Sequence, residues 1–353
     1  MLDLAVDPAE LTAALVDVES VSGDEGHLAG LVAAALRALP LNVTRDGNVV
    51  LARTDLGRDQ RVVLAGHLDT VPIADNVPSR RDGDVLHGCG TSDMKSGVAV
   101  LLRAAHLVGT GELDPRVDLT WVCYDCEEVE AARNGLGRLA RTDPDVLAGD
   151  LAILLEPTGG VVEGGCQGTM RAVVRIDGVR AHSARSWLGR NAIHAAAPVL
   201  ARLASYEARE VDVDGLRFHE GLNAVKITGG VAGNVVPDEC LVTVNYRYAP
   251  DRSEEDAAAH IKDVFAGFDL TVLDSAPAAR PGLDSPTAAA FAAAVGGEPR
   301  AKLGWTDVAR FGELGIPAVN FGPGDPNLAH KPEEHVAMQQ VLDVETALLR
   351  FLG

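Results

Sequence analysis

Cysteine is scarce in this chain of 353 residues, which has five thiols, at positions 89, 123, 126, 166 and 240. An odd number without regular spacing does not suggest a disulfide framework, so reduced thiols are expected. Cys123 and Cys126 form a CxxC at the end of a predicted strand, but no second CxxC completes a structural zinc site. The cysteines therefore indicate neither a disulfide scaffold nor a redox motif.

Long apolar runs and an excess of basic residues are also missing. No apolar stretch reaches the roughly 20 residues that cross a bilayer. The first residues include Asp3, Asp7 and Glu10 and lack the basic and apolar pattern of a signal peptide. The 31 basic and 51 acidic residues give a formal net charge of -20, which opposes binding to nucleic acid or to an anionic membrane. We therefore expect a soluble, cytoplasmic protein.

Short apolar runs that end in polar residues alternate with helical patterns along much of the chain. The runs RVVLAG, VDLTWVCY, DLAILL and IPAVNFG predict buried strands, and residues 94–108 and 287–295 predict helices. This alternation predicts an α/β fold with a mainly parallel sheet flanked by helices. The chain length and the hydrophobic fraction of 47% favour two structural units.

The middle of the chain has a different pattern. Between about residues 170 and 275, strands and helices follow in the order βαββαβ, which is typical of a small ferredoxin-like α+β domain. Because functional motifs occur on both sides of this segment, we interpret it as an insertion. The predicted divisions are residues 1–169 and 282–353 for one catalytic domain and residues 170–281 for the inserted domain.

Two motifs place candidate metal ligands after predicted secondary structure. In GHLDTVP, His67 ends a strand, and Asp69 is well spaced to orient its imidazole ring. In LHGCGTSDMKSG, Asp93 ends a loop that contains glycine, where a carboxylate can bridge two cations. Each motif also has an ordinary structural interpretation, as a hydrogen-bonded histidine for His67 and as a helix N-cap for Asp93.

Three further motifs make the metal interpretation stronger. Glu127 and Glu128 follow a strand in YDCEEVEA, Glu156 ends a strand in LLEPT, and His330 follows another strand in NLAHKPEEHV. An isolated pair of glutamates is usually a solvated surface feature, but four strand ends here lead into His or Glu. Two histidines with several carboxylates suit zinc or a similar divalent metal. Five ligands and a sixth acid fit two metals that share one carboxylate.

At these residues the sequence resembles the dizinc amidase family that contains aminoacylase, acetylornithine deacetylase, succinyl-diaminopimelate desuccinylase and related peptidases. The five motifs occur in the family's order along nearly the whole chain. The resemblance implies two Zn²⁺ ions, with Co²⁺ as a substitute, and a general base that takes a proton from water. By this resemblance, His67 and Glu156 would bind one zinc, Glu128 and His330 the other, Asp93 would bridge them, and Glu127 would be the general base. Asp69, spaced to orient His67, is a further predicted catalytic residue.

The resemblance also assigns functions to the inserted segment. It implies a homodimer formed through this domain, with His182 in GVRAHSARSWLG reaching the partner's active site to steady the oxyanion. The alternative for His182 is a turn histidine on a polar surface. Asn234 in GNVVP and Arg247 in VNYRYAP fall where related enzymes contact substrate, and an arginine can hold a carboxylate with two hydrogen bonds. Thr306 in GWTD is expected to line the same pocket.

A narrower resemblance, to actinobacterial-type succinyl-diaminopimelate desuccinylases, is carried by YDCEE, GCQGT and RAHSARSWLG. It implies hydrolysis of N-succinyl-LL-2,6-diaminopimelate to succinate and LL-2,6-diaminopimelate, in the biosynthesis of lysine and peptidoglycan precursors. Gln167, where an arginine is expected, and Trp305, where a smaller residue is usual, depart from the pattern and leave the carboxylate pocket open. An acetylornithine deacetylase, aminoacylase or dipeptidase would use the same metal centre. A catalytically silent metal-binding homologue is the alternative of another class.

Overall fold

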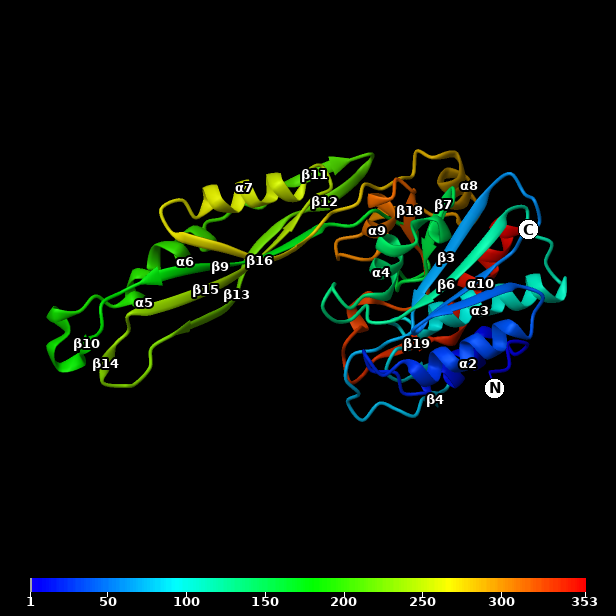
Figure 1. The fold of residues 1–353 in the computed structure, drawn as a ribbon, viewed down its shortest axis with the longest axis horizontal. Coiled ribbons are helices and arrows are strands. Elements are labelled where there is room, and N and C mark those ends of the chain that lie inside the picture. Colours follow the sequence, from blue (N-terminus) through cyan, green and yellow to red (C-terminus); the bar gives the residue numbers. More distant parts are fainter. Residues whose placement is uncertain (1) are drawn as a thin grey trace. The chain divides into compact units, whose positions relative to one another are not determined.

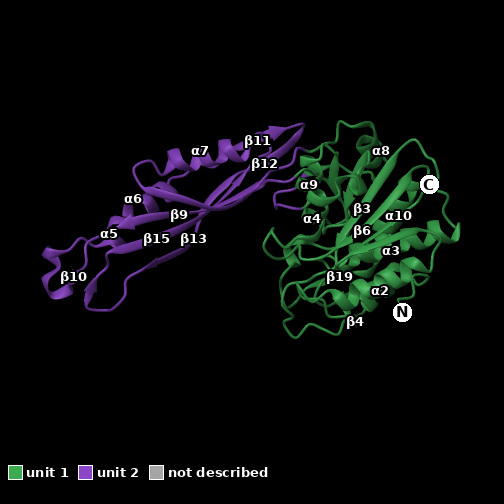
Figure 2. Ribbon diagram, viewed as in Figure 1, with its two compact units in different colours: residues 1–165, 281–300, 307–353 green, residues 166–280, 301–306 purple. Residues whose placement is uncertain are grey.

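The chain divides into two compact units, as Figure 2 shows, and a computed structural model describes residues 2–353 of it. Unit 1 contains the chain up to Gly165 together with residues 281–300 and 307–353. Unit 2 contains Cys166–Arg280 and Ala301–Thr306. The structure therefore begins the inserted unit four residues before the predicted start at residue 170. It also assigns to unit 2 a short segment that we predicted as part of the catalytic domain.

Hydrogen bonds explain these boundaries. Cys166 and Ala279 form an antiparallel bridge in which each backbone N–H donates to the other's carbonyl at 3.0 Å. Trp305 donates from Nε1 to the carbonyl of Pro277 at 3.1 Å, and the Cys166 thiol lies 3.6 Å from the carbonyl of Thr306. The segments that enter and leave unit 2 are thus joined to each other within that unit.

Unit 1 is built around an eight-stranded mixed sheet with the order β1-β2-β6-β3-β7-β18-β8-β17. Its central strands β6, β3, β7 and β18 are parallel, whereas β1 and β2 at one edge and β8 near the other run antiparallel to their neighbours. The strands are β1 (Asn42–Asp46), β2 (Val49–Arg53), β3 (Arg61–His67), β6 (Asp118–Tyr124), β7 (Leu151–Leu154), β8 (Glu163–Gly164), β17 (Arg300–Ala301) and β18 (Ala318–Asn320). A separate small sheet has the order β19-β5-β4, with β4 (Arg80–Asp82), β5 (Val85–His87) and β19 (His335–Ala337).

Helices cover both faces of the large sheet (Figure 1). The helices of unit 1 are α1 (Pro8–Val16), α2 (Gly26–Arg37), α3 (Lys95–Thr110), α4 (Gly135–Thr142), α8 (Pro286–Val295), α9 (Val308–Glu313) and α10 (Met338–Leu352), with 3-10 turns η1 (Pro144–Leu147) and η3 (Pro326–Leu328). Helices α1, α2, α3, α8 and α10 pack with Val62, Leu64 and Trp121 in the main core. Because side chains alternate along a strand, Val63 and Ala65 face the other side, where α4 and α9 lie.

Unit 2 has an antiparallel sheet with the order β13-β15-β9-β16 and helices on one face. Its elements are β9 (Gly168–Asp177), β10 (Ala181–His182), η2 (Ser183–Leu188), α5 (Ala192–Ala195), α6 (Ala197–Ala204), β11 (Glu210–Val213), β12 (Leu216–His219), β13 (Gly221–Gly229), β14 (Val235–Val236), β15 (Glu239–Tyr248), α7 (Glu254–Val264) and β16 (Asp269–Ala276). The βαββαβ order and the predicted fold class are confirmed. The β11–β12 hairpin and the short β10–β14 pair were not predicted.

Local chemistry fixes several element ends. Asp7 accepts hydrogen bonds from the backbone of Ala9 and Glu10 at the start of α1, and Pro8 occupies the first helical position, where its missing N–H costs nothing. Ser253 and Asp256 form a capping box at the start of α7.

All five cysteines are buried free thiols, as expected.

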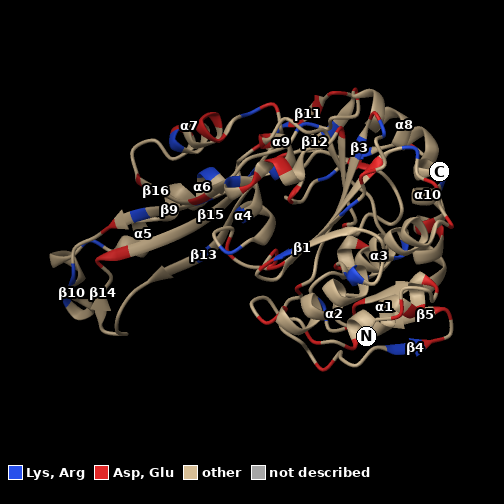
Figure 3. Ribbon diagram, turned by 45° about the vertical axis from the view of Figure 1, so that its right-hand side comes forward, with Lys and Arg blue, Asp and Glu red and all other residues tan. Residues whose placement is uncertain are grey.

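Figure 3 shows acidic positions along both units, several of them beside basic ones, so the net charge of -20 is distributed along the chain. Among residues 2–353, no helix combines the length and apolar composition that a membrane span requires.

One buried carboxylate secures the start of β6. The side chain of Asp118 accepts hydrogen bonds from Thr54 Oγ1 at 2.7 Å and from the backbone N–H groups of Leu56 and Arg58 at 2.8 and 2.9 Å. Burial alone would raise the pKa of Asp118, but the hydrogen bonds from these three donors outweigh it and lower the pKa to about 2. The charged form of Asp118 therefore stabilises the folded protein.

Asp118→Asn is expected to lower the free energy of unfolding by about 2 kcal/mol at pH 7. Since the folded pKa lies below the unfolded one, the contribution is complete above about pH 4 and is lost as the pH falls through 2. Urea denaturation of both proteins at pH 7 and in steps below pH 5 measures this. Asp114→Asn, at an exposed position that pairs with Arg58, is the matched control and should change stability little. A stability difference that stays constant down to pH 3 would contradict the assignment.

Candidate active site

The candidate residues of unit 1 converge at the carboxyl ends of three neighbouring parallel strands. His67 is the last residue of β3 and pairs in register with Tyr124, the last residue of β6. Glu127 and Glu128 follow β6, and Glu156 follows β7, the strand on the other side of β3. Ligand sites in parallel α/β sheets occur at this edge, because strand ends present their following side chains there.

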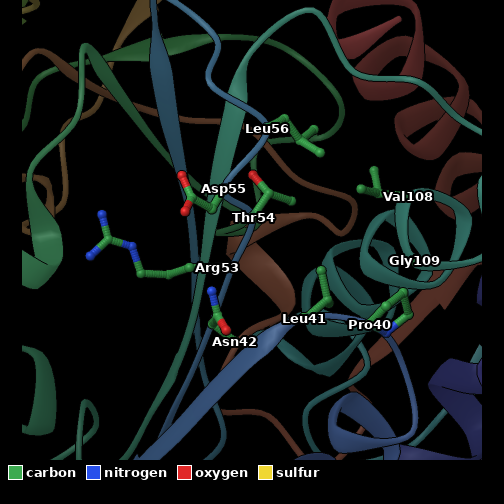
Figure 4. A pocket seen from close by; sticks show the side chains of 9 residues that line it. All are labelled: Pro40, Leu41, Asn42, Arg53, Thr54, Asp55, Leu56, Val108 and Gly109. Carbon is green, nitrogen blue, oxygen red and sulfur yellow. The ribbon is translucent and has the colours of Figure 1, made fainter.

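A cavity of about 350 Å³ lies away from this edge of the sheet, and Figure 4 shows the side chains that line it. Its lining includes Arg53 and Thr54, and Arg53 pairs with Thr120 near the amino end of β6. None of the candidate site residues lines it. We therefore locate the chemistry at the carboxyl edge.

The two carboxylate oxygens of Asp93 face two different imidazole rings. Oδ1 lies 3.1 Å from His67 Nε2, and Oδ2 lies 3.4 Å from His330 Nε2. The N-cap position of α3 is Met94, and it makes no side-chain capping bond, so the alternative role of Asp93 as a helix cap is wrong. The carboxylate of Asp93 points into the cluster instead of at the helix.

His67 is buried and oriented by a backbone carbonyl. Its Nδ1 lies 2.9 Å from the carbonyl oxygen of Asp69 and 3.6 Å from the nearer carboxylate oxygen of that residue. Since a carbonyl only accepts, Nδ1 carries the hydrogen and Nε2 faces Asp93. Asp69 thus orients His67 as predicted from the spacing, but through its main chain.

The carboxylate of Asp69 instead holds the loop after β6. Its Oδ1 accepts from the backbone N–H of Glu127 and its Oδ2 from that of Glu128, both at 3.0 Å. Ser22 Oγ donates to Oδ2 at 2.7 Å. Ser22 lies 47 positions earlier in the chain, so no local sequence pattern indicated it.

His330 and Glu128 form the exposed side of the cluster. Nε2 of His330 lies 3.0 Å from both carboxylate oxygens of Glu128. The His330 side chain is 54% exposed, whereas that of Glu128 is 7% exposed. We predicted His330 after a strand; it follows β18, but the 3-10 turn η3 lies between them, and His330 has a left-handed backbone with φ of 65°.

Opposite charges shift the pKa of the facing groups. Burial disfavours the imidazolium of His67, but its hydrogen bond to Asp93 and the nearby carboxylates outweigh this and raise the pKa of His67 well above its usual value. Hydrogen bonds to Asp93 and Glu128 raise the pKa of His330 to about 10. The pKa of Asp93 is lowered despite its burial, because it accepts from both histidines. The cluster therefore favours positive charge between these side chains.

Glu127 lies beside this group in a setting that favours its neutral form. Burial raises the pKa of Glu127 well above its usual value, and the negative charges of Glu156 and Asp307 add to the effect. Asp307 is fully buried and accepts from Asn134 Nδ2 at 2.9 Å. Tyr124 is buried as well, and burial followed by the charge of Asp307 raises the pKa of its phenol. The sequence analysis did not identify Tyr124 or Asn134, whose partners are distant along the chain.

The segment that carries Glu156 is pressed between two glycines. A Cβ on Gly97 in α3 would lie 2.0 Å from the carbonyl oxygen of Leu155, and one on Gly322 would lie 2.3 Å from the same atom. Glu156 is 5% exposed, and its charge raises the pKa of both His67 and Glu127. The absence of side chains at these glycines allows Glu156 to lie at the edge of the cluster.

Two sets of three side chains within residues 2–353 bring potential metal-ligand atoms within 4.8 Å of one another. One set is His67, Asp93 and Glu128. The other contains Glu25, whose Oε1 accepts from the backbone of Gly23 at 2.6 Å and of Cys126 at 3.2 Å, together with Asp125 and Cys126. Burial raises the pKa of the Cys126 thiol to about 11, so it is not a ready thiolate ligand. We interpret the second set as structural.

The first set fits a metal centre. With Nδ1 of His67 donating to a carbonyl, a neutral ring presents a lone pair at Nε2 to the carboxylate of Asp93, and only a proton or a cation between them removes the repulsion. Imidazole nitrogen with carboxylate oxygen is the donor set of zinc and related divalent metals.

The four other predicted residues belong to unit 2. His182 is exposed, and its Nδ1 accepts from the backbone N–H of Ala184 at 3.1 Å, which leaves Nε2 for another partner. Asn234 is exposed beside it, with its carbonyl accepting from the backbone N–H of Ser183. The hydrogen bond between Ser183 and Asn234 therefore places His182 and Asn234 close together.

Arg247 and Thr306 lie elsewhere in unit 2. Arg247 is on β15, where its Nε donates to Asn245 Oδ1 at 3.1 Å, and burial lowers the pKa of its guanidinium. Thr306 is buried, with its carbonyl next to the Cys166 thiol. Gln167, at the position where we expected an arginine, donates from Nε2 to the carbonyl of His219 at 2.6 Å. This side chain serves the local fold of unit 2.

Known proteins resemble the chain along its full length. Residues 63–353 match Peptidase family M20/M25/M40. The chain is 57% identical over 357 residues to a putative succinyl-diaminopimelate desuccinylase DapE of Mycobacterium tuberculosis, covering 100% of both chains. It is 49% identical over 362 residues to the succinyl-diaminopimelate desuccinylase of Corynebacterium glutamicum, covering 100% of this chain and 98% of that one. The structure of the Bacillus subtilis YXEP protein, a dinuclear metal binding peptidase, is similar with a TM-score of 0.71 at 15% identity, covering 98% and 96%.

Gly97→Ala is expected to displace the Leu155–Glu156 segment, because the added methyl group would overlap the Leu155 carbonyl. We expect a loss of about 1–3 kcal/mol in the free energy of unfolding and weaker binding of divalent metal. Urea denaturation and equilibrium dialysis with Zn²⁺ measure the two effects. Gly26→Ala is the control, since its nearest neighbour would be Asn48 Oδ1 at 3.7 Å. Unchanged metal binding in a folded Gly97→Ala protein would show that the glycine does not position Glu156.

Proposed function

Because the chain belongs to Peptidase family M20/M25/M40, we propose that the cluster at the carboxyl edge of the unit 1 sheet is the metal centre of an amide hydrolase. Its function is the hydrolysis of N-succinyl-LL-2,6-diaminopimelate to succinate and LL-2,6-diaminopimelate, in the biosynthesis of lysine and peptidoglycan precursors. The observation that carries this conclusion is the end-to-end match to two relatives that are named for this reaction. The predicted fold class, family and reaction are thereby confirmed.

The metal content is proposed in finer detail from the geometry of Asp93. We assign two Zn²⁺ ions, with Co²⁺ as a substitute, to a site in which Asp93 is the shared ligand. Its two oxygens face His67 and His330, which supports one histidine on each ion. Glu128, next to His330, would help to hold the second ion, and Glu156, whose charge acts on His67, would help to hold the first. Such a pair supplies Lewis acidity that polarises an amide carbonyl and lowers the pKa of water.

Glu127 is the proposed proton carrier. Its carboxylate takes a proton from the attacking water while the oxygen of that water bonds to the carbonyl carbon. The protonated Glu127 then donates this proton to the amide nitrogen as the carbon–nitrogen bond breaks, which releases succinate and the free amine. The raised pKa of Glu127 favours the step in which its protonated form donates to the leaving nitrogen. Asp69 holds the backbone of Glu127 in place.

We propose that the protein is a homodimer formed along β13 and the neighbouring helices of unit 2. Within residues 2–353, β13 is the edge strand of its sheet and pairs with β15 alone. Its exposed apolar side chains include Val225 and Ile227, at 57% and 49%, and Ile193 and Leu200 on α5 and α6 are exposed as well. A second copy related by a two-fold axis would pair with this edge and cover these side chains.

The substrate contacts are proposed from unit 2. His182, from the partner subunit, would donate from Nε2 to the developing oxyanion, since its Nδ1 is already occupied as an acceptor. Asn234 lies beside it, and Arg247 and Thr306 are assigned to the substrate carboxylates. A cytoplasmic location, where such precursors are made, completes the proposal.

The substrate assignment is tested by measuring kcat/KM of the zinc-loaded protein with N-succinyl-LL-2,6-diaminopimelate, N-acetylornithine and simple dipeptides. The succinyl substrate is expected to be preferred, and preference for another compound would overturn the assignment.

Glu127→Gln should keep its metal content and lose about 10²–10⁴-fold in kcat. Glu130→Gln, at an exposed position in the same loop, should retain wild-type turnover.

A mixing experiment tests the shared site. His182→Ala and Glu127→Gln proteins are each expected to be nearly inactive. After subunit exchange, a heterodimer contains one site with both an intact Glu127 and an intact His182, so part of the activity should return. Light scattering and a tagged subunit establish that exchange has occurred. Absence of recovery in mixtures that have exchanged would contradict a contribution of His182 across the dimer.

A further inference from the structure

We propose that Glu334 is a positioning residue that fixes the loop carrying Asp93 to the loop carrying His330. This inference rests on the proposed metal centre, because it explains how two of the proposed ligands are held together. Glu334 is 2% exposed and follows His330 by four residues. Its carboxylate does not belong to the ligand cluster of His67, Asp93 and Glu128.

The Glu334 carboxylate accepts three backbone hydrogen bonds from one short loop. Oε1 accepts from the N–H of Ser92 at 2.8 Å and from that of Asp93 at 2.9 Å. Oε2 accepts from the N–H of Gly90 at 3.0 Å. One side chain thus determines the path of the backbone that ends at the shared ligand.

Main-chain contacts reinforce the same connection. The N–H of Gly88 donates to the carbonyl of Glu334 at 3.1 Å, and Ser92 Oγ donates to the carbonyl of His335 at 2.9 Å. Strand β19 begins at His335 and pairs antiparallel with β5, whose last residue, His87, is its register partner. The loop after β5 and the segment before β19 are therefore adjacent, and hydrogen bonds to the Glu334 side chain join them.

The three hydrogen bonds require a side chain with two acceptor oxygens and the length of glutamate. A glutamine at position 334 would present an NH₂ group where one of the two oxygens now accepts, and at least one backbone N–H would lose its partner. An aspartate keeps both oxygens but is shorter by one methylene group. Adjacent Glu333 is exposed and makes no side-chain contact of this kind among the described residues, so Glu333→Gln is a matched control for the change in charge.

The experiment compares the full-length wild-type protein with Glu334→Gln and Glu333→Gln. Equilibrium dialysis with Zn²⁺, the visible absorption spectrum of the Co²⁺-loaded proteins, and kcat and KM at several metal concentrations are measured. We expect Glu334→Gln to bind at least one ion about 10–100-fold more weakly and to show an altered Co²⁺ spectrum. Its kcat should fall, recover in part with excess metal, and leave KM nearly unchanged, while Glu333→Gln should match wild type.

The outcomes separate the two proposals. If wild type binds two ions and hydrolyses the substrate while Glu334→Gln has the same metal affinity and Co²⁺ spectrum, the positioning role is wrong and the proposed function stands. If wild type binds no divalent metal, both proposals fail together. Should Glu334→Gln not fold, Glu334→Asp is used, with a smaller weakening of metal binding expected. Wild-type affinity in that variant would also overturn the inference.

Discussion

The concentration of carboxylates at one edge of a parallel sheet is the constraint on which the rest of the site depends. Three neighbouring strands end in this region, and each is followed by acidic side chains. Burial makes their mutual repulsion stronger, because the local dielectric constant is lower than that of water. A fold that brings these groups together must therefore supply compensation for each one.

The structure compensates the carboxylates in different ways, and these differences match the proposed roles. Asp69 accepts from two backbone N–H groups and a hydroxyl, which stabilise its charge and make it a fixed support. Asp93 faces two imidazoles, so its charge is matched by positive charge, as expected of a shared metal ligand. Glu127 has no such partner among the described residues except the nearby charge of His67, and its pKa is raised. Environments that push similar groups apart in pKa are a common sign of acid–base chemistry.

The sequence predicted what depends on local pattern. Apolar runs of buried strands identified β3, β6 and β7, and the residues that follow them formed the candidate site, because parallel strands end at a common edge. Asp93 had two local interpretations, and only its side-chain direction in the fold decided between them. Ser22 and Glu334 were not identified, because each acts on a partner far along the chain and resembles a surface residue in its own segment. The sequence also did not show that Asp69 orients His67 with its backbone carbonyl and not with its carboxylate, since both groups belong to the same residue.

The choice of substrate has a different physical basis from the chemistry. The proposed ligands and Glu127 all belong to unit 1, and one fold can carry more than one reaction. A metal centre that polarises an amide carbonyl acts on the amide bond, which all candidate substrates share. It therefore distinguishes little between their side chains. Discrimination must come from groups that meet the charged ends of the substrate. The proposed groups lie in unit 2, where Arg247 is a partly buried cation. Gln167 is uncharged, and its Nε2 donates to the carbonyl of His219. We therefore propose that Arg247, and not residue 167, is the residue of unit 2 that recognises a substrate carboxylate.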